Sequence, residues 1–88
     1  MNVSYRKRFL KDLNKIPGPA KDRIQETVFE QIPQAASLQD IEGLKKIQGF
    51  SGYYRLRVSD YRIGMFIQKD VIVFCRVLHR QDIYKYFP

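Results

Sequence analysis

Strand-like alternation is clearest in residues 53–67, which read YYRLRVSDYRIGMFI. Apolar and polar side chains alternate on both sides of Ser59-Asp60, a pair with the length and composition of a tight hairpin turn. The same alternation returns over residues 71–78, after a short loop at 68–70. The sequence therefore predicts three consecutive antiparallel strands.

Hairpin geometry determines which side chains share a face, because cross-strand partners lie on the same side of a sheet. Across the first turn, Arg57 is expected opposite Arg62. A three-residue loop at 68–70 places Arg62 opposite Arg76, whereas a loop of even length would put Arg76 unpaired into the core at high cost. We therefore expect the odd loop. It leaves Cys75 as a buried, unreactive thiol on the core face. The opposite face then carries Tyr53, Arg55, Arg57, Arg62, Phe66, Phe74 and Arg76.

The N-terminal half predicts one strand and two helices. Residues 3–5 alternate, and apolar side chains then recur every three or four positions over residues 9–16, which is the period of an amphipathic helix. The PGP motif at 17–19 ends this helix. A second apolar stripe, over residues 20–32, ends at Pro33. The two helices are expected to form a hairpin.

These elements predict a single α+β domain over residues 1–88. It has an N-terminal strand, a two-helix hairpin and then antiparallel strands that form one sheet packed under the helices.

With 44% hydrophobic residues the chain is too apolar for a disordered tail. Its apolar runs are far shorter than the ~20 residues that span a bilayer, and no secretory signal is evident. We expect a cytoplasmic protein without a membrane partner. One Cys and one His exclude an internal disulfide and a Cys/His metal site, and no cofactor is expected.

The formal net charge of +7 favours a polyanionic partner. Nine of the 16 bases but only three of the 9 acids follow residue 44. Nucleic acid is favoured over a membrane surface, because no Lys-rich amphipathic helix is present to lie on lipid. The arginines of the predicted sheet face repel one another, and an anionic ligand would remove that repulsion. A solvated face on which arginine stems cover apolar surface is the structural alternative.

Aromatic side chains accompany these arginines. Tyr53, Phe66 and Phe74 lie on the same predicted face, where they suit the bases of single-stranded RNA or simply cover one another. After the last strand, His79 is the only imidazole of the chain, a side-chain type suited to proton transfer beside a phosphate. A structural role at the strand end is its alternative. Tyr84 and Tyr86 either stack on a ligand or pack a C-terminal turn.

The whole chain resembles toxins of the RelE/ParE superfamily, specifically the RelE-type mRNA interferases of type II toxin–antitoxin systems. The resemblance rests on the element order and on three segments: LKKIQG at 44–49, GYYRLRVSDYRI at 52–63 and HRQDIY at 79–84. It implies a metal-independent endoribonuclease that cleaves mRNA in the ribosomal A site and inhibits translation. The implied chemistry is attack of a ribose 2′-hydroxyl on the adjacent phosphate. The implied partners are the ribosome, mRNA and a RelB-like antitoxin, with which the toxin forms a hetero-oligomer.

The resemblance also implies residue roles. Arg55 and Arg57 match a basic pair on the first hairpin strand, and Arg62 matches an arginine that stabilises the transition state. Arg80 matches an arginine after the last strand, and Tyr84 matches a tyrosine that stacks on the substrate base. The general base is open between Arg55, His79 and Arg80, because a guanidinium accepts protons poorly. The predicted catalytic residues are Arg55, Arg57, Arg62, His79, Arg80 and Tyr84. The predicted RNA-binding residues are Lys45, Lys46, Tyr53, Phe66, Phe74, Arg76 and Tyr86. A ParE-like toxin that inhibits DNA gyrase and cuts no RNA is the alternative function.

Overall fold

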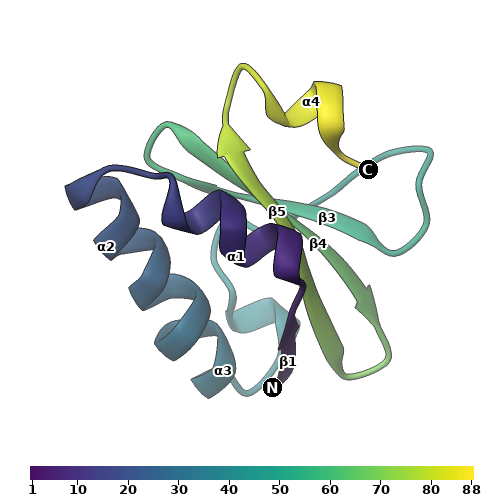
Figure 1. Ribbon diagram of the computed structural model, residues 1–88. Helices are drawn as coiled ribbons and strands as arrows, with labels where there is room; N and C mark the ends of the chain where they lie inside the picture. Colours follow the sequence, from purple (N-terminus) through teal and green to yellow (C-terminus); the bar gives the residue numbers. More distant parts are fainter.

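The computed structural model describes residues 1–88 and has its N-terminal helices on one side of a twisted sheet (Figure 1). Its elements are β1 (Asn2–Tyr5), α1 (Lys7–Asn14), α2 (Gly18–Glu26), a π-helical turn (Thr27–Gln31), α3 (Ile32–Gln34), a 3₁₀ turn (Leu38–Asp40), β2 (Lys45–Lys46), β3 (Tyr53–Val58), β4 (Tyr61–Gln68), β5 (Val71–His79) and α4 (Ile83–Tyr86). This order confirms the predicted α+β class. None of the helices is both long and apolar enough to cross a bilayer.

The sheet contains five strands in the order β1-β5-β4-β3-β2. β1 runs parallel to β5, and the other neighbours are antiparallel. The N-terminal strand therefore joins the C-terminal strand rather than the first hairpin. β2 is only two residues long and pairs with β3.

The apolar periodicity of the N-terminal half accounts for its two helices. Phe9 and Leu13 are buried along α1 and Ile16 is buried just after it, while Ile24 and Val28 are buried along the second helix. Figure 1 shows α1 and α2 together on one side of the sheet. Their apolar stripes and the inner face of the sheet form the main core.

The second helix continues through Pro33 rather than ending at it, because α2, the π-helical turn and α3 follow one another without a break. In the π-helical turn, the N–H of Ile32 donates to the carbonyl of Thr27. Pro33 has no N–H to offer the next carbonyl, that of Val28. The hydroxyl of Tyr5 donates to that carbonyl instead and ties β1 to the helix.

The first hairpin has the predicted register, with Arg57 opposite Arg62. The second hairpin differs from the prediction that placed Arg62 opposite Arg76. Its turn has two residues rather than three, so that Gln68 lies opposite Val71, and Arg62 lies opposite Leu78.

A β-bulge at Cys75 explains how this even turn avoids burying Arg76. Met65 pairs with Phe74 and Gly64 pairs with Arg76, so Cys75 has no partner and the alternation shifts by one residue. Before the bulge, Phe74 points into the main core and is 0% exposed. The prediction that Phe74 lies on the RNA-binding face is therefore wrong.

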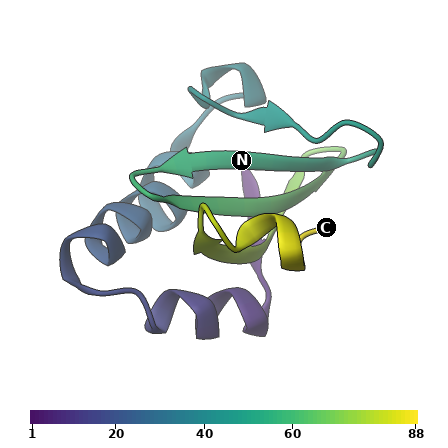
Figure 2. The ribbon, with the colours of Figure 1, turned by 90° about the horizontal axis from the view of Figure 1, so that it is seen from above.

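A second, smaller core lies on the other face of the sheet. It contains Cys75 with Ile83 and Phe87, the residues that flank and anchor α4. Cys75 is buried as expected, but in this cluster rather than in the main core. Figure 2 shows α4 beside the strands and apart from the other helices.

Candidate functional site

An open pocket of about 260 Å³ lies on the sheet face opposite α1 and α2. It brings together residues from β2, β3, β4 and α4 and from the turn that precedes β2. They are Gly43, Lys45, Arg55, Arg57, Arg62 and Tyr84. Five residues predicted from the sequence thus converge on one site.

The register of the strands concentrates positive charge in this pocket. Lys45 lies opposite Arg55, and Arg57 lies opposite Arg62. Like charges in directly opposed positions destabilise a sheet. Both ion pairs of the chain lie elsewhere, so none of these four cations has a carboxylate partner. A bound anion would relieve the repulsion.

Arg62 is the cation most affected by this crowding. Its guanidinium donates to two backbone carbonyls at the β3–β4 turn, at 3.1 and 3.4 Å. Partial burial lowers the pKa of Arg62. The charges of Arg57, Arg55 and Arg80 lower this pKa further, and Asp60 opposes the shift. Arg62 therefore gains more than an isolated arginine would from a phosphate in the pocket.

Tyr84 supplies an aromatic surface at the same place. The guanidinium of Arg55 lies 5.4 Å from the centroid of its ring, within cation–π range. The side chain is 63% exposed, while its neighbour Ile83 is buried and anchors the helix. An exposed ring beside clustered guanidinium groups suits a nucleotide, with the base on the ring and the phosphate on the cations.

Comparison with known proteins identifies the family to which the chain is similar. A family model described as the ParE toxin of type II toxin–antitoxin system, parDE, matches residues 3–84. The chain is 46% identical to Toxin RelE3 of Methanocaldococcus jannaschii, over 100% of both chains. The chain belongs to the RelE/ParE toxin superfamily.

Solved structures of superfamily members share its fold. The RelE chain of the RelB–RelE antitoxin–toxin complex from Methanococcus jannaschii superimposes with a TM-score of 0.82 at 44% identity, covering 98% of this chain and 100% of that one. The toxin–antitoxin complex RelBE2 of Mycobacterium tuberculosis gives 0.71 at 23% identity, with 92% of each chain covered. Isolated E. coli RelE gives 0.66 at 20%, covering 96% of this chain and 90% of that one.

In this RelE/ParE toxin, Arg80 and His79 leave the end of β5 on different sides. Arg80 lies near enough to Arg62 to lower its pKa, and its backbone N–H donates to the carbonyl of Asp60 at 2.8 Å. His79 instead pairs with Tyr61, and their rings meet edge to face with centroids 5.6 Å apart. The expected grouping of His79 with the pocket arginines is therefore not found.

Arg76 is paired within the toxin fold rather than free on the arginine face. Its Nε lies 2.7 Å from Oδ2 of Asp12, and its Nη2 lies 3.2 Å from Oδ1. The same Oδ2 accepts the backbone N–H of Val77 at 3.2 Å. The Arg76 guanidinium also lies 5.7 Å from the centroid of the Tyr86 ring. Asp12 balances the charge of Arg76, so the RNA contact predicted for Arg76 would have to displace this ion pair.

Two aromatic residues expected to contact RNA pack within the small core. The rings of Tyr53 and Phe66 lie 4.9 Å apart, and Tyr53 meets Phe87 edge to face at 5.6 Å. The sequence left open whether these rings contact RNA bases or cover one another, and in the structure they pack against one another. Phe74 stacks on Tyr5 at 5.1 Å inside the main core and cannot reach a ligand.

The remaining RNA-binding candidates lie outside the pocket. Tyr86 is 59% exposed but faces Arg76. Lys46 lies opposite Tyr54, so it projects to the other face of β2 from Lys45. Only Lys45 of this lysine pair lines the pocket.

Two residues were not predicted from the sequence: one lines the pocket, and the other pairs with Arg76. Gly43 lines the pocket with φ +86°, a backbone conformation that favours glycine, and only its place before LKKIQG could have indicated this. Asp12 lies between Phe9 and Leu13 on the inward side of α1. A carboxylate in an apolar stripe signals a buried partner, but it does not identify Arg76.

Proposed function

We propose that this protein is a toxin that cleaves mRNA held in the ribosomal A site. The observation that carries the proposal is the convergence of Lys45, Arg55, Arg57 and Arg62 beside the exposed ring of Tyr84. No carboxylate neutralises these cations within the fold. A site of this kind is suited to one nucleotide and the phosphate that follows it.

The reaction that fits this pocket is internal transfer at phosphorus. The ribose 2′-hydroxyl gives up its proton to water as its oxygen forms a bond to the adjacent phosphorus. The bond from phosphorus to the 5′-oxygen breaks, and that oxygen takes up a proton from water. The products are a 2′,3′-cyclic phosphate and a 5′-hydroxyl. Negative charge builds on the phosphoryl oxygens in the transition state, where Arg57 and Arg62 can stabilise it.

The arginines act on charge rather than as bases, because a guanidinium holds its proton at any physiological pH. His79 lies outside the pocket and is not assigned a proton-transfer step. Arg80 lies close to Arg62 and adds to the positive potential at the reacting phosphate.

We also propose a RelB-like antitoxin as the partner of this toxin. The support is the 44% identical RelE chain, which is solved as an antitoxin–toxin complex with RelB. An antitoxin that covers the pocket would keep the cations of the toxin from contacting RNA until the antitoxin dissociates.

A second candidate is inhibition of DNA gyrase, as expected of a ParE-like toxin. The family model that matches residues 3–84 is a ParE model, and this favours the second candidate. An inhibitor that only binds a protein has no need of a pocket of uncompensated cations beside an exposed ring. This pocket favours the nuclease.

The test is expression of the chain without an antitoxin, followed by mapping of RNA 5′ ends and of plasmid supercoiling. The nuclease proposal expects new 5′ ends within translated codons, and cleavage of mRNA on purified ribosomes. Arg62→Ala should slow single-turnover cleavage about 100-fold or more, as loss of one transition-state donor does. Arg23→Ala removes an exposed arginine of α2 and serves as the matched control. Intact transcripts together with altered supercoiling would replace the nuclease by the gyrase inhibitor.

A further inference from the structure

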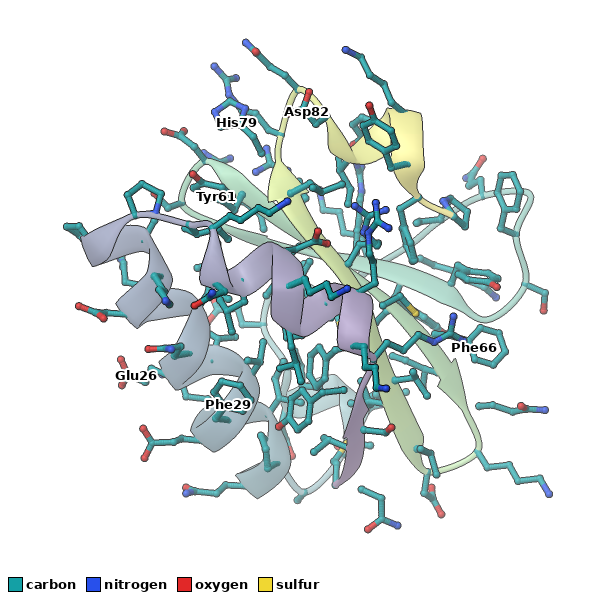
Figure 3. All side chains as sticks on the ribbon, in the orientation of Figure 1. Glu26, Phe29, Tyr61, Phe66, His79 and Asp82 are labelled. Carbon is teal, nitrogen blue, oxygen red and sulfur yellow. The ribbon has the colours of Figure 1, made fainter.

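His79 lies in a second hollow, separate from the pocket and at the β5 edge of the sheet. This hollow has a volume of about 500 Å³ and lies between α1 and the end of β5. The edge-to-face rings of Tyr61 and His79 form one wall (Figure 3). Nδ1 of His79 accepts the backbone N–H of Gln81 at 3.3 Å, so the neutral ring carries its proton on Nε2 and can donate it.

The rim of this hollow is a row of bases on α1 and on the residue that caps its C-terminus. Arg8, Lys11 and Lys15 are exposed and line it at spacings of three and four residues, which is one side of a helix. None of the three has a carboxylate within ion-pair distance. They form a second uncompensated cationic surface.

The carboxylates of the hollow are already engaged. Asp12 is held by Arg76 at 2.7 Å, and Asp82 lies 3.9 Å from Lys85. The three α1 bases therefore dominate the potential of the rim. This excess of positive charge suits an anionic ligand rather than a cationic one.

The hollow and the pocket flank the same end of the sheet. Tyr61 and Arg62 are consecutive in β4 and point to opposite faces, one into each site. A strand of polyanion that crosses the β3–β4 turn can therefore contact both sites.

We propose that the hollow binds the phosphodiester backbone of RNA as a second contact outside the reaction pocket. This inference rests on the proposed nuclease function. From Arg8 to Lys15 the helix advances about 10 Å, at about 1.5 Å per residue. At a rise of about 3.4 Å per nucleotide, that length spans three nucleotide steps of a phosphodiester backbone. The rings of Tyr61 and His79 offer an edge for a sugar or base.

The test compares two triple variants that lose the same charge. The first replaces the rim bases: Arg8→Gln, Lys11→Gln and Lys15→Gln. The control replaces three lysines outside both sites: Lys7→Gln, Lys21→Gln and Lys69→Gln. Both are assayed with the wild-type chain for binding to mRNA-programmed ribosomes from 50 to 200 mM KCl, and for single-turnover cleavage at saturating ribosomes. Thermal unfolding checks that all three chains are folded.

We expect the rim variant to bind at least about 20-fold more weakly than the control at 50 mM KCl. Three lost phosphate contacts lower the slope of log K against log salt by about 2, at about 0.7 each, so the deficit relative to wild type shrinks roughly 20-fold by 200 mM. The saturated cleavage rate stays unchanged, because the rim does not touch the reacting phosphate.

The outcomes separate this inference from the function on which it rests. If the wild-type chain cleaves RNA but the two triple variants bind ribosomes alike, the second contact is refuted while the nuclease stands. If the wild-type chain neither binds nor cleaves RNA, the proposed function fails and the inference fails with it. If the rim variant loses only its affinity for an acidic antitoxin, the hollow is a protein interface and the inference is overturned.

Discussion

Replacing Asp12 by alanine should destabilise the protein more than the loss of any exposed charge. Asp12 is only 8% exposed and is the sole carboxylate that meets Arg76. It also accepts the backbone N–H of Val77, a residue that is 1% exposed. β1 pairs with β5 only as far as Phe74. Beyond that point, the Asp12 carboxylate accepts the backbone N–H of the β5 edge that a neighbouring strand would otherwise accept.

The magnitude follows from the groups left without partners. An unsatisfied buried N–H costs about 1–3 kcal/mol, and breaking a buried ion pair by removing one partner costs about 3–5 kcal/mol. The Arg76 side chain is 16% exposed and can turn partly toward water, so the combined cost is smaller than the sum of these two values. We expect a loss of about 3 kcal/mol in the free energy of unfolding, or about 15 °C in Tm for a domain of this size.

Urea and thermal unfolding followed by circular dichroism measure this loss. Asp22→Ala, which removes an exposed carboxylate of α2, should change stability by no more than about 0.5 kcal/mol. The double variant Asp12→Leu/Arg76→Met should recover the part of the loss that comes from the unpaired charge of Arg76, since apolar residues replace a buried ion pair at little cost, while the Val77 N–H stays without its acceptor. A loss below about 1 kcal/mol for Asp12→Ala, or a double variant no more stable than the single one, would refute the reasoning.

Three further changes test other contacts. Tyr5→Phe leaves the Val28 carbonyl without its donor and should cost about 1–2 kcal/mol in urea unfolding. Gly64→Ala places a methyl group 2.6 Å from ring atoms of Phe87 and should cost about 1–3 kcal/mol while shifting the amide NMR signals of α4. Burial raises the pKa of Cys75, so its reaction with a thiol reagent should be slow until the chain unfolds. Because this pKa is higher in the folded chain, the stability from the neutral thiol is complete below the unfolded pKa and is lost as pH rises above about 8.5.

The sequence predicted the first hairpin and half of the pocket because nothing interrupts the alternation there. Ser59 occupies a turn position with φ 56°, and the two strands carry polar residues on one face only. Arg57 and Arg62 therefore meet as the parity rule requires.

The second hairpin could not be predicted in the same way. From Val71 to Cys75 the strand is apolar on both faces, so these residues do not distinguish the two parities and only the charge of Arg76 favoured the odd loop. The bulge at Cys75 then changes the parity with no polar residue to mark it. The positions assigned to Phe74 and Arg76 depended on that parity. The partnership of Arg76 with Asp12 spans 64 positions in sequence and has no local signature.

The same partnership links the folding of α1 to the construction of the pocket. α4 has only four residues, far too few to be stable as an isolated helix. It is held by the burial of Ile83 and Phe87 on one side and by the contact of Tyr86 with Arg76 on the other. Since α4 carries Tyr84 into the pocket, a carboxylate on the far face of the sheet helps to place the ring that is proposed to stack on RNA. Asp12→Ala should then weaken RNA binding even at temperatures where the variant is fully folded, whereas a pocket independent of this link would keep its affinity.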